Sequence, residues 1–349
     1  MGAISVNDKQ TFAPRLLTSK DYNQRVLVEE VHGLLKVYKD GHVDRPPIVP
    51  AAPCSYAPVP AVASADVTVD HFSGIWARFY VPKQQQHHQP GNLLPLLIYF
   101  HGGGFCVGSA SWRCYHEFLA TLASEAGCLI MSVEYRLAPE NRLPAAFDDG
   151  VAAVKWVQQQ TASGAGAEEQ RWWASRCNFS RVFLGGDSSG ACLAYNAAAR
   201  VGPANPKPLC LKGMILIQPF FGGEARAASE KNMVQTSNSA LSLAASDTYW
   251  RLALPVGANR DHPFCNPLCR AAAKLEDLEL PPTLVCVAEM DILKDRNVEL
   301  CGAMKRAGKT LEMVVYSGVG HAFQILHNSP MSRPRTSDMI SRLSSFINR

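Results

Sequence analysis

The residues best suited to covalent chemistry lie in a short segment that reads Gly186-Asp-Ser-Ser-Gly190. An apolar run at residues 182–184 precedes it, and a helical pattern begins near Ala191. A serine at a sharp turn between a strand and a helix holds its hydroxyl exposed in strained backbone geometry, and flanking glycines avoid clashes there. The N-terminus of the following helix also favours negative charge. Ser188, the centre of the pentapeptide, is the predicted nucleophile.

Two other interpretations of this segment compete with this prediction. Ser189 is the rival nucleophile, but it lies off the centre of the motif, and its expected contribution is a backbone N–H. Ser188 or Ser189 could also be the N-cap of a helix in a glycine-rich loop. The motifs described next favour the nucleophile.

A glycine-rich turn follows the apolar run at residues 94–100 and reads His101-Gly-Gly-Gly-Phe105. Consecutive glycines let backbone N–H groups point at one small volume, which a developing oxyanion requires. We expect Gly103 and Gly104 to supply two donors and Ser189 a third. His101 is expected to brace the loop by hydrogen bonding.

A serine nucleophile needs a histidine to take its proton and a carboxylate to orient that histidine. Both should lie just beyond downstream strands, in the chain order Ser, acid, His. The run at 284–288 is followed by Glu289-Met-Asp291, and the run at 311–316 by Ser317-Gly-Val-Gly-His321. Asp291 and His321 fit these positions.

Each of these two predictions has rivals. Glu289 comes early after its strand, and Asp295 is expected at the start of the next helix, where an acidic side chain complements the helix dipole. His262 lies near a predicted insertion, and His327 in a predicted loop or helix.

The elements that would position these residues alternate along the chain. Apolar runs recur at 94–100, 129–133, 182–184, 214–217, 284–288 and 313–316. Helical patterns occur between them and after them, at 115–125, 147–158, 191–200, 296–307 and 337–347. Continuous apolar strands alternating with helices indicate an α/β fold with a mostly parallel sheet that helices cover on both faces.

Three segments depart from this alternation. Residues 1–62 combine a polar start, an amphipathic stretch at 26–37 and a proline-rich run, and are predicted to be an arm. Residues 63–349 form the predicted catalytic domain, beginning with a β-hairpin at 65–80. Residues 222–266, rich in Ala, Ser and Asn, are a predicted insertion, whose Tyr249, Trp250 and Phe264 could line a pocket or pack internally.

Two tracts are expected to be loops. The first is the Gln- and His-rich tract at 84–89, where a metal role for His87 and His88 has weak support. The second is the Gly/Ala stretch at 163–167.

Taken in order, these motifs resemble the plant carboxylesterases of the hormone-sensitive-lipase-like group, which have the α/β-hydrolase fold and are related to gibberellin receptors. The matching segments begin at His101, Tyr135, Pro144, Gly186, Asp291 and Gly320 and read HGGGF, YRLAPE, PAAFD, GDSSG, DIL and GHAF. The resemblance runs from about Val28 to the C-terminus.

The resemblance implies a triad of Ser188, Asp291 and His321, with oxyanion donors at Gly103, Gly104 and Ser189. It implies a cap built from the arm and the insertion, uncharged small to medium esters as substrates, including xenobiotics and plant hormone esters, and no cofactor or metal. The chain departs from the family's usual residues at Ser189 and Ala191 near the nucleophile, and at Glu289, which could perturb the charge balance of the triad.

Two relatives of this group leave other functions open. The gibberellin receptors bind a hormone without turnover and lack the catalytic histidine, whereas this chain has His321 and an unsubstituted HGGG turn. An isoflavanone dehydratase uses a related pocket for elimination, and the sequence does not exclude that reaction.

The composition of the chain limits the kinds of partner that we expect it to bind. The net charge of +4 comes from scattered Lys and Arg, which argues against nucleic-acid binding. No signal peptide and no stretch of about 18 apolar residues is evident, so we expect no membrane partner. Eleven cysteines without CxxC spacing suggest reduced thiols and a cytoplasmic protein. A homodimer is compatible with the sequence, which does not determine the oligomeric state.

Overall fold

The computed structural model describes residues 25–83, 93–162, 172–202, 209–234 and 239–349. The first 24 residues of the predicted arm lie outside the described residues. So do the predicted loop at 84–89 with His87 and His88, the stretch at 163–167, and part of the insertion.

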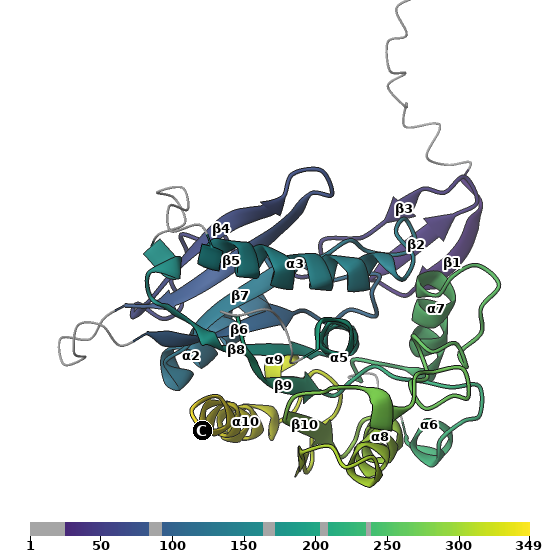
Figure 1. Ribbon diagram of the computed structural model, residues 1–349. Coiled ribbons are helices and arrows are strands. Elements are labelled where there is room, and N and C mark those ends of the chain that lie inside the picture. Colours follow the sequence, from purple (N-terminus) through teal and green to yellow (C-terminus); the bar gives the residue numbers. More distant parts are fainter. Residues whose placement is uncertain (1–24, 84–92, 163–171, 203–208, 235–238) are drawn as a thin grey trace, which may run out of the picture.

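A central sheet organises the described chain (Figure 1). Its strands are β4 Val62–Asp70, β5 Ile75–Pro82, β6 Leu94–Phe100, β7 Leu129–Glu134, β8 Cys177–Asp187, β9 Leu211–Ile217, β10 Thr283–Ala288 and β11 Leu311–Tyr316. Among the described residues their order is β11-β10-β9-β8-β6-β7-β5-β4. Strand β5 pairs antiparallel with β4 and β7, and the remaining pairs are parallel. The predicted mostly parallel sheet is confirmed.

Helices cover both faces of this sheet. They are α2 Arg113–Ala126, α3 Ala145–Ala162, α5 Ser189–Val201, α8 Lys294–Arg306 and α10 Ser332–Ile347. Along β6, Leu96, Ile98 and Phe100 pack in one core cluster with residues of α3 and α5. The alternate residues Leu97 and Tyr99 belong to a second cluster with α2 and α10. In Figure 1, α3 and α10 lie on opposite sides of strands β6, β8 and β9. Strands buried on both faces explain the continuous apolar runs of the sequence.

Two elements begin five residues earlier than the patterns predicted. Helix α10 starts at Ser332, five residues before the expected start. Its first turn contains Pro334, which a helix tolerates there because no intrahelical N–H bond is lost. Strand β8 starts at Cys177 instead of residue 182, and its added residues are mostly polar and only partly buried. Apolar content therefore marked only the buried part of this strand.

A second, smaller sheet precedes the central one. Strands β1 Leu27–Val31, β2 Leu35–Tyr38 and β3 Val43–Asp44 pair antiparallel, so the predicted amphipathic stretch at 26–37 forms a hairpin. The predicted insertion contains α6 Ala228–Asn232 and α7 Leu243–Ala253. Figure 1 shows β1 beside α7. An ion pair of 2.9 Å between Arg251 and Glu29 links the two.

Arg45 ties the arm to the loops of the central sheet. Its Nε donates to the carbonyl of Cys106 at 2.7 Å, and its Nη2 donates to the carbonyl of Ala138 at 2.9 Å. The same guanidinium makes a bidentate pair with Glu140, at 2.7 Å for both bonds. The arm is thus anchored directly to the glycine-rich turn that follows β6.

Candidate active site

Ser188 joins the end of β8 to the start of α5. Its φ of 53° and ψ of −119° lie outside the conformations that L-residues ordinarily adopt. The turn packs tightly on the end of β6, because a Cβ at Gly190 would lie 2.0 Å from the carbonyl oxygen of Phe100. Only glycine fits at that contact. The pentapeptide therefore forms the strand-to-helix turn that the sequence predicted.

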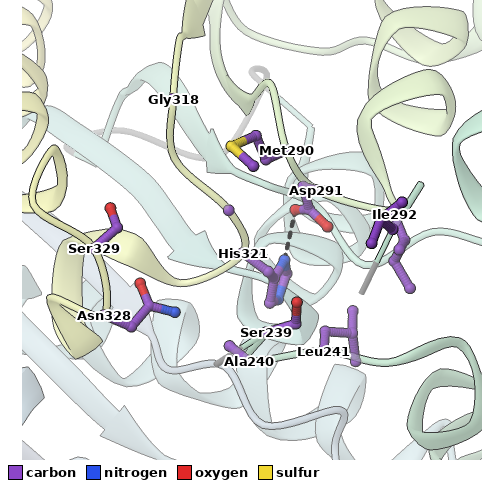
Figure 2. Close-up of a pocket in the computed structure, with 12 residues that line it drawn as sticks. Ser239, Ala240, Leu241, Met290, Asp291, Ile292, Gly318, His321, Asn328 and Ser329 are labelled. Atoms are coloured by element: carbon purple, nitrogen blue, oxygen red, sulfur yellow. Dashed lines mark hydrogen bonds and ion pairs between the residues drawn. The ribbon is translucent and has the colours of Figure 1, made fainter. Parts of the chain in front are cut away.

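Three side chains from the carboxyl ends of separate strands meet at this turn. His321 follows β11 by five residues, and its Nε2 lies 2.9 Å from Ser188 Oγ. Its Nδ1 lies 2.6 Å from Oδ2 of Asp291, three residues beyond β10. All three residues are buried. Figure 2 shows the imidazole directed at the Asp291 carboxylate. This continuous chain of contacts can pass a proton from the serine to the histidine.

The electrostatics of His321 favour its charged form. Burial lowers the pKa of the imidazole, but the charge of Asp291 and its hydrogen bond act in the opposite direction, with a further contribution from Asp187. The net result is a pKa raised above the ordinary value of 6.5. An imidazolium formed during a reaction would be stabilised at this position.

The rivals for these roles lie elsewhere. Glu289 directly follows β10, and its Oε2 accepts the N–H of Gly318 at 2.9 Å. Asp295 lies in the first turn of α8 and accepts the N–H of Ser229 at 2.6 Å. His262 packs its ring against Phe264. His327 follows the short helix α9, Phe323–Leu326. The structure brings none of them into hydrogen-bonding contact with Ser188.

The predicted oxyanion residues lie in the turn after β6 and at the start of α5. Phe100 pairs with Gly186 in the β6–β8 register, so this turn is adjacent to Ser188. Gly103 and Gly104 have φ values of 120° and 59°. Within the described chain, no acceptor pairs with the N–H of either glycine. Ser189 is the first residue of α5, where backbone N–H groups lack intrahelical partners.

His101 braces this turn, as expected. The residue is completely buried, and its Nδ1 lies 2.8 Å from the carbonyl oxygen of Gly102. Its ring stacks on Tyr135, with ring centroids 4.3 Å apart. Burial lowers the pKa of His101 to about 4, so the ring is neutral near pH 7.

Sequence reasoning missed Asp187, the residue just before Ser188. Its carboxylate accepts hydrogen bonds from the hydroxyls of Tyr99 at 2.9 Å and Tyr115 at 3.0 Å. It also accepts the N–H of Gly102 at 3.1 Å, so it connects the nucleophile turn to the glycine-rich turn. Burial raises the pKa of Asp187 to about 6, although the tyrosine hydrogen bonds oppose the shift. A charged residue at the end of a buried strand was the available signal.

Of the three aromatic residues expected in the insertion, Tyr249 comes nearest to the site. Its ring packs over Gly104, where a Cβ would lie 2.4 Å from the Tyr249 Cγ. The other two pack on core aromatics. Trp250 stacks on Phe220 at 4.8 Å between ring centroids, and Phe264 meets Phe147 edge-on at 5.2 Å. Cys106 and Cys192 are buried, and burial raises the pKa of both thiols.

A cavity of about 100 Å³ opens on the side of His321 and Asp291 (Figure 2). Apart from these two residues, the described side chains that line it are uncharged. They are Val234, Ser239, Ala240, Leu241, Met290, Ile292, Asn328 and Ser329, with Gly318 and Gly320 completing the wall. Such a lining suits a neutral molecule better than an ionic one, because its one carboxylate, Asp291, is already bonded to His321.

In the part of the chain that the structure describes, no helix combines the length and apolar character needed to cross a membrane. All eleven cysteines lie in described segments and have free thiols.

Comparison with known proteins places the chain in a family. A family model described as alpha/beta hydrolase fold matches residues 97–325. A probable carboxylesterase of Arabidopsis thaliana is 46% identical over 92% of this chain and 91% of that protein. A 2-hydroxyisoflavanone dehydratase of Glycyrrhiza echinata is 36% identical over 95% and 97%.

Solved structures agree with this placement. An esterase of Pyrobaculum calidifontis superposes with a TM-score of 0.66, at 26% identity over 81% of this chain and 84% of that one. The chain belongs to the α/β-hydrolase family, in the group of plant carboxylesterases that its sequence motifs indicated.

Proposed function

We propose that this protein hydrolyses carboxylic esters, with Ser188 as nucleophile, His321 as general base and acid, and Asp291 as the group that orients His321. The observation that carries the proposal is the run of two contacts, 2.9 Å from Ser188 Oγ to His321 Nε2 and 2.6 Å from His321 Nδ1 to Asp291 Oδ2. Family membership supports the same class of reaction.

In the first half-reaction, Ser188 Oγ attacks the ester carbonyl carbon while its proton moves to His321 Nε2. The tetrahedral intermediate then collapses, the bond to the alkoxy oxygen breaks, and His321 returns the proton to the leaving alcohol. An acyl-enzyme remains on Ser188. Water, deprotonated by His321, attacks the acyl carbon and releases the carboxylic acid.

The backbone N–H groups of Gly103, Gly104 and Ser189 are the proposed donors to the oxyanion. Support comes from the position of the glycine turn beside Ser188 and from the unpartnered N–H groups of Gly103 and Gly104. Fixed donors stabilise the charge without reorganising during the reaction, and loss of one donor costs roughly 3 kcal/mol of transition-state stabilisation in comparable sites.

The substrates we propose are neutral esters of small to medium size, in keeping with a cavity lining that is uncharged apart from Asp291 and His321. We further propose that the arm and the insertion together form a cap over the site. The Arg251–Glu29 ion pair between α7 and β1, and the Tyr249 ring over Gly104, support that arrangement. A cytoplasmic location stays a prediction from sequence.

A dehydratase is the second candidate, because the relative from Glycyrrhiza echinata is 36% identical and carries that name. In such a reaction His321 could act as a base in removing a proton, while Ser188 would form no acyl intermediate. The two candidates differ in whether Ser188 becomes acylated.

A panel of p-nitrophenyl esters and a 2-hydroxyisoflavanone, assayed side by side, tests the proposal. We expect the wild-type protein to release p-nitrophenol and the Ser188→Ala variant to lose that activity. Faster loss of water from the isoflavanone than cleavage of any ester would favour the dehydratase. Tight binding of a gibberellin without turnover of either substrate would favour a receptor.

A further inference from the structure

We propose that Gln218 is a positioning residue that holds His321 at its working distance from Ser188. The inference rests on the proposed esterase function and extends it to a residue outside the triad. Gln218 directly follows β9, and its side chain is only 1% exposed.

The segment that carries Gln218 holds the backbone of Ser188 at both ends. The N–H of Ser188 donates to the carbonyl of Ile217 at 2.8 Å. The N–H of Phe220 donates to the carbonyl of Ser188 at 3.0 Å. The N–H of Gln218 itself donates to the carbonyl of Cys286 in β10 at 2.8 Å. This segment is therefore fixed relative to the nucleophile.

The side chain of Gln218 extends the same connection to the histidine. Its Oε1 accepts the N–H of Ala322, the residue after His321, at 2.7 Å. Gln218 and Ala322 both have left-handed backbones, with φ values of 48° and 58°. Such conformations persist in residues other than glycine only where the surroundings impose them. The hydrogen bond joins two such turns, one beside the nucleophile and one beside the base.

Neighbouring groups keep this connection rigid. The carbonyl of Pro219 accepts a 2.8 Å hydrogen bond from Nδ2 of Asn297, a fully buried residue of α8. The Gln218 amide is neutral, so it fixes the His321 turn without placing a third carboxylate near the imidazole beside Asp291 and Asp187. Position 218 therefore requires a neutral side chain that is as long as glutamine and carries a hydrogen-bond acceptor.

Three variants of Gln218 test separately the length of its side chain, its hydrogen-bond acceptor and its lack of charge. Gln218→Met keeps the length and removes the acceptor, whereas Gln218→Asn keeps the amide and falls short by one methylene. Gln218→Glu keeps both length and acceptor but adds a charge. Each would be assayed with p-nitrophenyl acetate for kcat, KM and pH profile, and with a fluorophosphonate for the rate of labelling. Near-ultraviolet circular dichroism and thermal melting would establish folding.

We expect kcat and the labelling rate to fall by about 10²-fold in the Met and Asn variants, with KM little changed, because displacement of about 1 Å is enough for such a loss. The Glu variant should recover much of kcat at alkaline pH, with its acid limb moved to higher pH because the added negative charge favours the imidazolium. If the Met variant does not fold, the Asn variant provides the test.

The inference is overturned if a folded Met or Asn variant keeps wild-type kcat and pH profile. It is also overturned if the Glu variant loses as much kcat as the Met variant at every pH. Failure of the esterase proposal would look different, because the wild-type protein would then lack serine-dependent turnover or labelling before any change at Gln218.

Discussion

The imidazole of His321 lies near two buried carboxylates that hold it in different ways. Asp291 contacts Nδ1 directly, whereas Asp187 acts on the imidazole through its charge. Asp187 is also engaged by Tyr99, Tyr115 and Gly102. Removal of the Asp291 carboxylate should therefore change a different property of the reaction from removal of the Asp187 carboxylate.

For Asp291, the expected effect is on rate. Asp291→Asn should lower kcat by about 10⁴-fold, because the neutral amide favours the wrong tautomer of His321. Glu289→Gln is the matched control, since it neutralises an exposed carboxylate two residues away and keeps an acceptor for Gly318. Steady-state kinetics on a p-nitrophenyl ester measure both. Equal losses in the two variants would contradict the assignment of the acid.

For Asp187, the expected effect is on pH dependence. In the proposed mechanism, hydrolysis needs neutral His321, and the raised pKa of His321 places the acid limb above pH 6.5. The charge of Asp187 contributes to that rise, so Asp187→Asn should move the acid limb to lower pH. A pH profile of kcat/KM measures the shift. An acid limb that stays in place or moves to higher pH would show that this charge does not act on His321.

Among the elements, α7 meets the turn after β6 where the ring of Tyr249 packs over Gly104. A Cβ at Gly104 would collide with the ring of Tyr249, and the φ of 59° is itself unfavourable for alanine. Gly127, the C-cap of α2, has nearly the same φ of 57° and open space around it. Comparison of alanine substitutions at Gly104 and Gly127 therefore separates the effect of backbone strain from the effect of the collision with Tyr249.

Both Gly104→Ala and Gly127→Ala should lose about 1 kcal/mol of unfolding free energy through left-handed strain. Only Gly104→Ala should also lose esterase activity, because Tyr249 or the turn must move. Urea denaturation and ester turnover on the same samples check this. Full activity in Gly104→Ala would mean that the turn is not part of the catalytic machinery.

Arg45 supplies a second connection between elements, from the arm to the loops after β6 and β7. Arg45→Met should lower the unfolding free energy by about 2 kcal/mol, since charge-assisted hydrogen bonds to Cys106 and Ala138 are lost. Arg349→Met, which breaks an exposed ion pair with Glu312 outside the arm, should cost less than about 1 kcal/mol. Similar losses in both variants would argue against anchoring of the arm by Arg45.

The sequence predicted these elements to different degrees. Strand β6 has the predicted bounds because it is apolar throughout and buried from its second residue to its end. The helical pattern predicted the start of α10 too late, beyond Pro334 in its first turn. The polar beginning of β8 was not predicted, because apolar periodicity indicates only the buried part of a strand. The positions of Ser188, Asp291 and His321 relative to strand ends could be predicted from motifs. The roles of Asp187, Tyr249 and Gln218 could not, because they depend on contacts between segments distant in the chain.

For the whole molecule, the fold and the family are confirmed. The reaction depends in addition on the residues of the site. Relatives of one fold include a protein named as a carboxylesterase and one named as a dehydratase. A shared fold therefore does not determine the reaction. The proposed esterase differs from a dehydratase in forming a covalent acyl bond to Ser188.

The most direct test is reaction of the full chain with a fluorophosphonate, followed by peptide mass spectrometry. Phosphonylation should occur at Ser188 with loss of ester turnover, and the Ser188→Ala variant should be neither labelled nor active. Ser189 lies in the same peptide and serves as the internal comparison. A label at Ser189 or elsewhere, or ester turnover unchanged in Ser188→Ala, would contradict the proposed function.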